Sequence, residues 1–327
     1  MRPSEIALSL ETMIAARRPV FLWGSPGVGK SQTVAQVAAK AGIELRDVRA
    51  VQFDPVDLRG LPRIDSDGRT HWSVPDFLPR DGAGVLFLDE LNAADRAVQA
   101  ACYQLVLDRR LGEYALPDGW TVVAAGNNQS DRAVTNRMST ALASRFVHLE
   151  YEVHLDDWCK WAVEHDLPPE LIAFIRFRPN LLHAFDPQST ERTFPCPRTW
   201  EFIATIMRAH PAAAVEHELF KGTVGGGAAV ELSGFLRIWR KLPSMDSILL
   251  NPQTVAVPDD PGTLFAIAGG LARRATDRNF DRVMVYANRM PKEWAVYLVK
   301  DATRRDAALQ STEAFVKWAA LNSDVMG

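Results

Sequence analysis

A glycine-rich octet near the N-terminus has the residue types and the spacing of a loop that binds a phosphate chain. Residues 24–31 match the pattern G-x-x-x-x-G-K-[ST]; they follow the apolar run 19–23 and precede the helix-like run 32–39. Glycines let backbone N–H groups surround phosphate oxygens, and the helix start adds positive potential. The residues predicted to bind a nucleotide are Gly24, Ser25, Pro26, Gly27, Val28, Gly29, Lys30, Ser31 and Gln32. Within this set, we expect Lys30 to reach the β- and γ-phosphates of ATP and Ser31 to hold Mg²⁺.

Two adjacent carboxylates form the second feature. Asp89 and Glu90 directly follow the apolar run 84–88, which has the pattern of a buried strand. Ligands of an open parallel sheet bind at the carboxyl ends of its strands, where these side chains would lie. We expect Asp89 to bind the nucleotide's Mg²⁺, directly or through water. Glu90 is the candidate that orients and activates the water attacking the γ-phosphate.

Three further polar residues occupy positions that suit phosphate chemistry. Asn127 follows the strand-like run 121–126, and an amide supplies both a donor and an acceptor for a water or a phosphate. The adjacent Asn128 competes for this role. Arg145 stands between a predicted helix and a predicted strand, where it either forms a surface ion pair or reaches the nucleotide site of a neighbouring protomer. Arg198 lies in the first turn of a predicted helix, where a cation is unfavourable unless an anion lies opposite.

These residues are spaced along a pattern of alternating strands and helices, which predicts an α/β fold with a parallel sheet. Two excursions interrupt it: residues 61–74, with a hairpin signal at Asp67-Gly68, and residues 109–119, with a predicted turn at Pro117-Asp118-Gly119. From about residue 151 onward, the strand pattern stops and helical patterns follow. The five predicted strands are Val20–Trp23, Arg46–Phe53, Gly84–Leu88, Thr121–Ala125 and Phe146–Tyr151.

Composition limits the class of protein. The 327 residues carry a net charge of −3, which argues against a dominant nucleic-acid footprint. Three separated cysteines suit a reducing compartment, so we expect a cytoplasmic protein. No apolar run reaches membrane-spanning length, and the seven histidines show no metal-ligand spacing.

Taken in order, the five motifs resemble those of an AAA+ ATPase. Residues 24–31 match the Walker A loop, 86–90 the Walker B strand, Asn127 sensor 1, Arg145 the arginine finger and Arg198 sensor 2. The segments at about residues 61–74 and about 109–117 resemble the helix-2 insert and the presensor hairpin of the MoxR-like, CbbQ/NorQ and dynein-related branch. The resemblance covers residues 1 to about 240. It departs from the branch at Asn128, where a proline is common, and Arg137 is a second candidate for action on a neighbouring site.

The resemblance implies three regions: an α/β nucleotide-binding domain over 1–152, an α-helical lid over 153–242 and a helical extension over 243–327. It also implies a ring, expected to be a hexamer, in which Arg145 acts on the neighbouring protomer's ATP.

Two function classes compete. One is a chaperone-like ATPase that remodels a client with a partner carrying a von Willebrand factor A (VWA) domain. The other is a nucleic-acid motor, and a metal-chelatase subunit is a lesser alternative. Basic and acidic residues are mixed in both excursions, which favours the remodeller.

Overall fold

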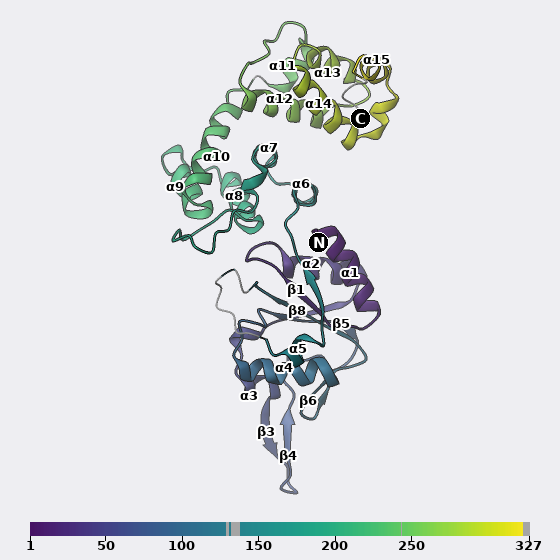
Figure 1. The fold of residues 1–327 in the computed structure, drawn as a ribbon, viewed down its shortest axis with the longest axis vertical. Coiled ribbons are helices and arrows are strands. Elements are labelled where there is room, and N and C mark those ends of the chain that lie inside the picture. Colours follow the sequence, from purple (N-terminus) through teal and green to yellow (C-terminus); the bar gives the residue numbers. More distant parts are fainter. Residues whose placement is uncertain (129–130, 132–137, 243, 323–327) are drawn as a thin grey trace. The chain divides into compact units, whose positions relative to one another are not determined.

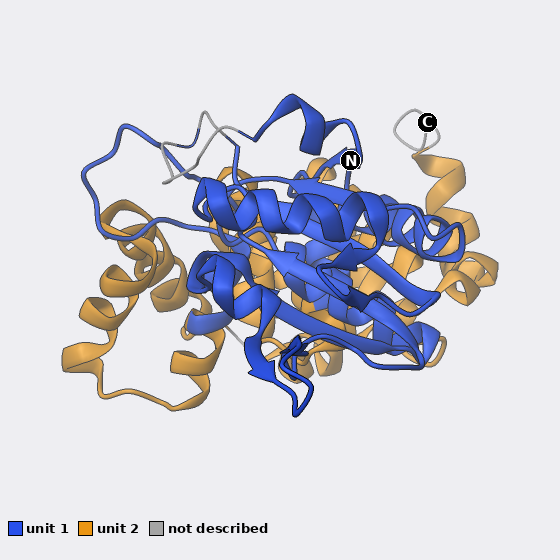
Figure 2. Cartoon of the chain, turned by 90° about the horizontal axis from the view of Figure 1, so that it is seen from below, with its two compact units in different colours: residues 1–161, 182–202 blue, residues 162–181, 203–327 orange. Residues whose placement is uncertain are grey.

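The computed structural model describes residues 1–128, 131, 138–242 and 244–322. Arg137 lies outside these residues. The chain forms two compact units (Figure 2). Unit 1 comprises residues 1–161 and 182–202, and unit 2 comprises residues 162–181 and 203–327. None of the helices among the described residues combines the length and the apolar composition that a membrane-spanning segment needs.

Unit 1 contains a five-stranded parallel sheet with the strand order β2-β5-β8-β1-β9 (Figure 1). This confirms the predicted α/β fold. One predicted strand was too long: it was expected to run to Phe53, but the chain leaves the sheet edge after Arg49. The short 3-10 helix η1 (Ala50–Gln52) follows, and Phe53 turns to pack on Phe77. The strands are β1 (Val20–Trp23), β2 (Glu44–Arg49), β5 (Ala83–Asp89), β8 (Gly119–Gly126) and β9 (Val147–Glu150).

Helices cover both faces of this sheet, because alternate side chains of its buried strands point to opposite faces and are apolar on each. On one face, Ile6 and Leu10 of α1 (Pro3–Ala15) and Val34 of α2 (Lys30–Ala41) pack in one core with Val85 and Phe87 of β5. The other face carries a second core. Its helices are α3 (Pro55–Arg59), α4 (Arg96–Asp108) and α5 (Thr140–Ala143).

Two short hairpins fall within the two excursions. The first pairs β3 (Leu61–Ile64) with β4 (Thr70–Ser73), and Gly68 adopts φ +77° in its turn. The second pairs β6 (Arg110–Leu111) with β7 (Tyr114–Ala115). A turn is present at the predicted Pro117-Asp118-Gly119, where Trp120 N donates to Pro117 O over 3.0 Å. It does not join the hairpin strands, which are connected at Gly112; this glycine adopts φ +61°, a conformation that glycine takes without strain.

Unit 2 is helical. The helices α6 (Leu155–Glu164) and α8 (Pro197–Arg208) each span a boundary between the units. The remaining α-helices are α7 (Pro169–Phe177), α9 (Ala213–Val224), α10 (Gly226–Trp239), α11 (Met245–Leu250), α12 (Pro261–Arg274), α13 (Phe280–Ala287), α14 (Lys292–Arg305) and α15 (Glu313–Leu321). Two 3-10 helices are η3 (Pro179–Leu181) and η4 (Ala307–Ser311).

The extension 243–327 lies in the same compact unit as α7. The ring of Phe177 lies 5.4 Å from that of Phe265 on α12. Asp301 on α14 is 7% exposed and pairs with Arg176 on α7 over 2.7 Å and with Arg305 over 3.0 Å. A buried carboxylate shared by two arginines therefore connects α7 to α14. The division into a lid and a separate extension stays a prediction.

Candidate nucleotide-binding site

The predicted phosphate loop connects β1 to α2, and its glycines set its shape. Gly27 has φ +76° and Gly29 has φ +107°, in the region where other residues are strained. Gly29 is also the N-cap of α2, so the loop runs directly into the first helical turn. The free N–H groups of that turn suit an anion. The loop geometry therefore fits a phosphate chain.

Lys30 is held against this loop and is 8% exposed. Its Nζ donates hydrogen bonds to Gly24 O over 2.6 Å, to Ser25 O over 3.1 Å and to Asn127 Oδ1 over 3.2 Å. Burial lowers the pKa of Lys30 to about 8, and the carboxylate of Asp89 opposes that shift. The amine therefore lies within the loop, where the negative charge of a bound phosphate would stabilise its protonated form.

Ser31 and Asp89 come together as the motif spacing predicts. Ser31 Oγ donates to Asp89 Oδ2 over 2.9 Å. A hydroxyl and one carboxylate are the protein ligands that Mg²⁺ commonly takes, with nucleotide phosphates and water completing its shell. In the described part of the chain, no group of three or more His, Cys, Asp or Glu residues could hold a metal alone. The residues present therefore fit a cation that arrives with a nucleotide.

Glu90 follows Asp89 with an unusual backbone. Its φ is +55°, in the left-handed region, and its N–H donates to Asp89 Oδ1 over 2.9 Å. Such a conformation costs on the order of 1–3 kcal/mol in a non-glycine residue, and it is common where a side chain must be aimed. The Glu90 side chain is exposed at the carboxyl end of β5.

Asn127, directly after β8, is the asparagine that contacts Lys30, which favours it over Asn128 for the sensor role. A residue that the sequence did not single out supports it. Asn92 bonds both main-chain polar atoms of Asn127. The one sequence signal for Asn92 was its position, three residues after Asp89 at the end of an apolar strand.

The start of α8 meets the phosphate loop inside unit 1. The N–H of Arg198 donates to Gly27 O over 3.2 Å. The neighbouring Cys196 is buried against the same glycine, because a Cβ at Gly27 would lie 2.5 Å from Cys196 Sγ. The guanidinium of Arg198 lies close enough to lower the pKa of Lys30, although burial is the main cause. The sequence motif predicted a role for Arg198, whereas the contact between Cys196 and Gly27 could be found only in the structure.

Arg145 is the predicted site residue that the fold does not bring to the loop. β9 runs parallel to β1, with Val147 beside Val20, and Arg145 precedes β9. It therefore lies at the amino ends of the strands, whereas the loop leaves the carboxyl end of β1. Its Nη1 donates to Ser144 Oγ over 2.7 Å, and its guanidinium lies 5.4 Å from the Tyr103 ring centre.

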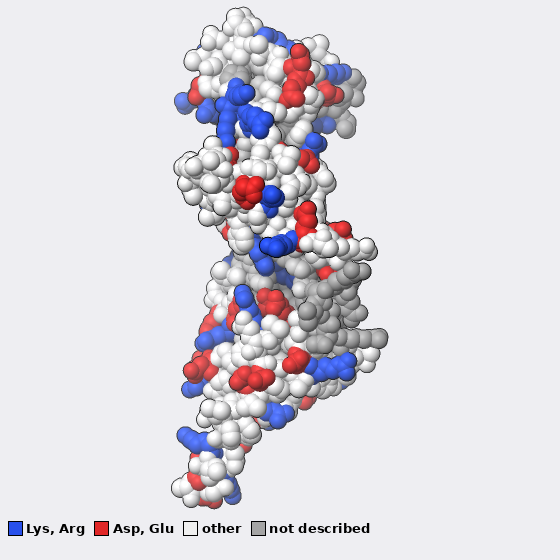
Figure 3. Space-filling view, turned by 90° about the vertical axis from the view of Figure 1, so that its left-hand side faces the viewer, with Lys and Arg blue, Asp and Glu red and all other residues white. Residues whose placement is uncertain are grey.

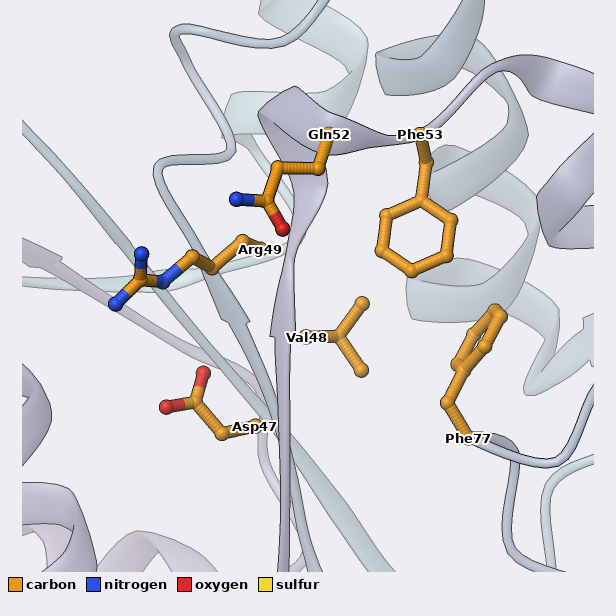
Figure 4. A pocket seen from close by; sticks show the side chains of 6 residues that line it. All are labelled: Asp47, Val48, Arg49, Gln52, Phe53 and Phe77. Carbon is orange, nitrogen blue, oxygen red and sulfur yellow. The ribbon is translucent and has the colours of Figure 1, made fainter.

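A pocket of about 310 Å³ lies at the edge strand β2 (Figure 4). Asp47 and Arg49 lie on one side of the strand, and Val48, Phe53 and Phe77 on the other. Burial, and next the carboxylate of Asp89, raise the pKa of Asp47. None of the predicted site residues lines this pocket, and it offers no glycine loop for phosphate. This pocket is therefore distinct from the predicted nucleotide site at residues 24–31.

The profile of the AAA domain (dynein-related subfamily) matches residues 19–146. Midasin of Giardia intestinalis is 27% identical over an alignment of 172 positions, which covers 49% of this chain and 4% of midasin. The chain thus corresponds to a small part of that relative.

Two solved structures are similar at low identity. The RuvB Holliday junction branch migration motor of Thermotoga maritima is 18% identical, with a TM-score of 0.43 over 82% of this chain and 80% of RuvB. NtrX of Brucella abortus, in complex with ADP, is 14% identical, with a TM-score of 0.43 over 98% of this chain and 67% of NtrX. At these scores they carry no functional argument. The profile match and the motif geometry agree over residues 19–146, which match the AAA domain of the dynein-related subfamily.

Proposed function

We propose that this chain hydrolyses MgATP in a ring and uses the energy to remodel a partner protein. The observation that carries the proposal is the pair of contacts from the phosphate loop to two strand ends, Lys30 to Asn127 and Ser31 to Asp89. They assemble the groups that phosphoryl transfer to water requires, because that reaction depends mainly on positioning and charge stabilisation.

Each residue has a role in this proposal. Lys30 binds the β- and γ-phosphates, and Ser31 and Asp89 hold Mg²⁺. The ion, when bound, supplies positive charge that stabilises the transferring phosphoryl group. Glu90 orients the attacking water and accepts its proton, while Asn127 holds that water or the γ-phosphate. Arg198, in the first turn of α8, contacts the bound nucleotide.

The ring follows from Arg145. Because Arg145 lies at the opposite end of the strands from its own loop, we propose that it completes the site of a neighbouring protomer. An arginine supplied in this way is worth about 10³–10⁵ in rate in related enzymes. AAA+ ATPases commonly oligomerise, and we propose a hexamer.

Surface charge favours a protein client over nucleic acid. The face shown in Figure 3 carries Lys and Arg as well as Asp and Glu, with one group of basic side chains on its upper part. In the β3–β4 hairpin, Arg63 and Arg69 pair with Asp65 and Asp67 over 3.6 and 3.5 Å. Paired arginines leave little excess positive charge for phosphates. We therefore propose a protein client and a VWA-domain partner.

ATP turnover against protein concentration, with the native mass in ATP and in ADP, tests this proposal. We expect the specific activity to rise with protein concentration as a ring-sized mass appears. Single-stranded DNA should not change this activity. Lys30→Ala should lose ATP binding, whereas Glu90→Gln should bind ATP and assemble without turnover. A monomer with concentration-independent turnover would overturn the ring, and strong stimulation by DNA would replace the remodeller with a nucleic-acid motor.

The partner requires its own experiment. Tagged Glu90→Gln, trapped with ATP, should retain a VWA-domain protein from the same cells, and Lys30→Ala should not. Equal recovery by both variants would show that capture does not depend on the ATP state.

A further inference from the structure

One buried side chain joins the acidic strand end to the sensor strand end. Asn92 Nδ2 donates to Asn127 O over 2.7 Å, and Asn92 Oδ1 accepts from Asn127 N over 3.3 Å. Asn92 is 2% exposed. Both halves of its amide are therefore used on the main chain of one residue, 35 positions later in the sequence.

The surrounding backbone is built around this contact. Leu91 N donates to Ala125 O over 3.0 Å, which continues the pairing of β5 with β8 past Asp89. A Cβ at Gly126 would collide with Asn92 Oδ1, so glycine leaves the space that the amide fills. Glu90, in its left-handed conformation, lies between Asp89 and this stretch. The turn that carries Glu90 is thus hydrogen-bonded to Ala125 and to Asn127.

We infer that Asn92 is a positioning residue for ATP hydrolysis, which holds Asn127 in register with Glu90. The inference rests on the proposed function, because it gives Asn127 a role in the reaction. Asn92 fixes the Asn127 main chain, and the Asn127 side chain accepts from Lys30 Nζ over 3.2 Å. The side chain of Asn92 therefore links the turn that carries Glu90 to Asn127. These are the two residues that we propose contact the attacking water.

A double-mutant cycle tests whether Asn92 acts through Asn127. We expect Asn92→Ala to lower kcat by about 10²-fold, the loss typical of a misplaced catalytic group, with little change in affinity for the fluorescent analogue mant-ATP. Asn127→Ala should lower kcat, and adding Asn92→Ala to it should cause no further loss. A purely structural Asn92 would lower kcat again in the double variant, which would overturn the inference.

Hydrogen exchange supplies a readout that needs no ATP. The N–H of Asn127 should exchange faster in Asn92→Ala than in the wild type, because its acceptor is gone. Unchanged exchange there would overturn the inference. If Asn92→Ala does not fold, Asn92→Asp keeps the Oδ1 acceptor but loses the Nδ2 donor. In that variant we expect the Asn127 N–H to stay protected and kcat to fall.

Asn128→Ala is the matched control, since it removes the neighbouring amide. It should retain turnover, and a loss equal to that of Asn127→Ala would assign the sensor to Asn128 and overturn the inference. A wild type without ATP turnover would instead refute the proposed function. The exchange of the Asn127 N–H would still decide whether Asn92 holds it.

Discussion

Lys30 Nζ donates a hydrogen bond to Asn127 Oδ1 over 3.2 Å, so the phosphate loop directly contacts the end of β8. The same amine is buried, and burial lowers its pKa to about 8 from the ordinary 10.5. A group with a lowered pKa and an anionic ligand must change its proton occupancy on binding. This contact therefore leads to a prediction about pH.

ATP binding should take up a proton at Lys30 between pH 8 and 10.5. In this window the free protein holds Lys30 mostly neutral, and the phosphate charges raise its pKa again. Calorimetry of ATP binding in two buffers of different ionisation enthalpy measures the uptake. The stability of the fold should also depend on pH in this window. The unfolded chain binds the Lys30 proton more tightly than the folded chain, so the unfolding free energy should rise as the pH rises from 8 to 10.5.

Lys30→Met is the control for the stability measurement, because it keeps the apolar stem and removes the amine. The pH-dependent rise in unfolding free energy should be smaller in this variant. Equal rises in the two proteins, or ATP binding by the wild type without proton uptake, would contradict a lowered Lys30 pKa.

The substitution Gly27→Ala should lower the unfolding free energy more than Gly68→Ala does. Both glycines have nearly the same φ, +76° and +77°. A Cβ at Gly27 would lie 2.5 Å from Cys196 Sγ, whereas one at Gly68 meets nothing within 4 Å. Gly68→Ala should lower the unfolding free energy by about 1 kcal/mol from backbone strain alone. Gly27→Ala should cost more and should weaken ATP binding.

Urea unfolding and ATP titration of the two glycine variants give this comparison. Equal losses of stability, with ATP binding intact in both, would mean that the contact between Cys196 and the phosphate loop is unimportant.

Arg145→Ala should bind ATP normally and lose turnover by about 10³-fold or more, because the missing guanidinium acts on the neighbouring site. Mixing this variant with Glu90→Gln should restore activity, since some sites then combine an intact Glu90 with a neighbour's Arg145. Turnover of the mixture against each variant alone is the measurement.

Arg137→Ala, the other candidate, serves as the comparison for this prediction. Full activity in Arg145→Ala together with loss in Arg137→Ala would transfer the role to Arg137.

Asp301→Ala should destabilise unit 2 by about 3 kcal/mol, because it leaves Arg176 and Arg305 without their shared buried carboxylate. Asp246→Ala is the control. It removes an ion pair with Arg274 whose two side chains are 50% and 68% exposed, and it should cost less than about 1 kcal/mol. Urea unfolding of the two variants compares them. Equal small losses would show that Asp301 does not hold α7 to α14.

The sequence alone determined the parts of the site that depend on local pattern. The glycine loop, the acidic strand end and Asn127 each follow from a few adjacent residues, because a strand, a loop and a helix start need particular side chains at fixed spacing. Repeated strand and helix patterns also led to the parallel sheet. The hairpin turn at Gly112 and the end of β2 at Arg49 were missed, since neighbouring packing decided them.

Only the tertiary structure decided which distant residues meet. The strand order places the ends of β5 and β8 side by side, so Asn92 reaches Asn127, and it places Arg145 at the opposite end of the sheet from the loop. Cys196 similarly lies against Gly27 from far along the chain. Hydrogen bonds and close packing between such residues act over a few ångströms in space. Local periodicity carries no information about them until the sheet has assembled.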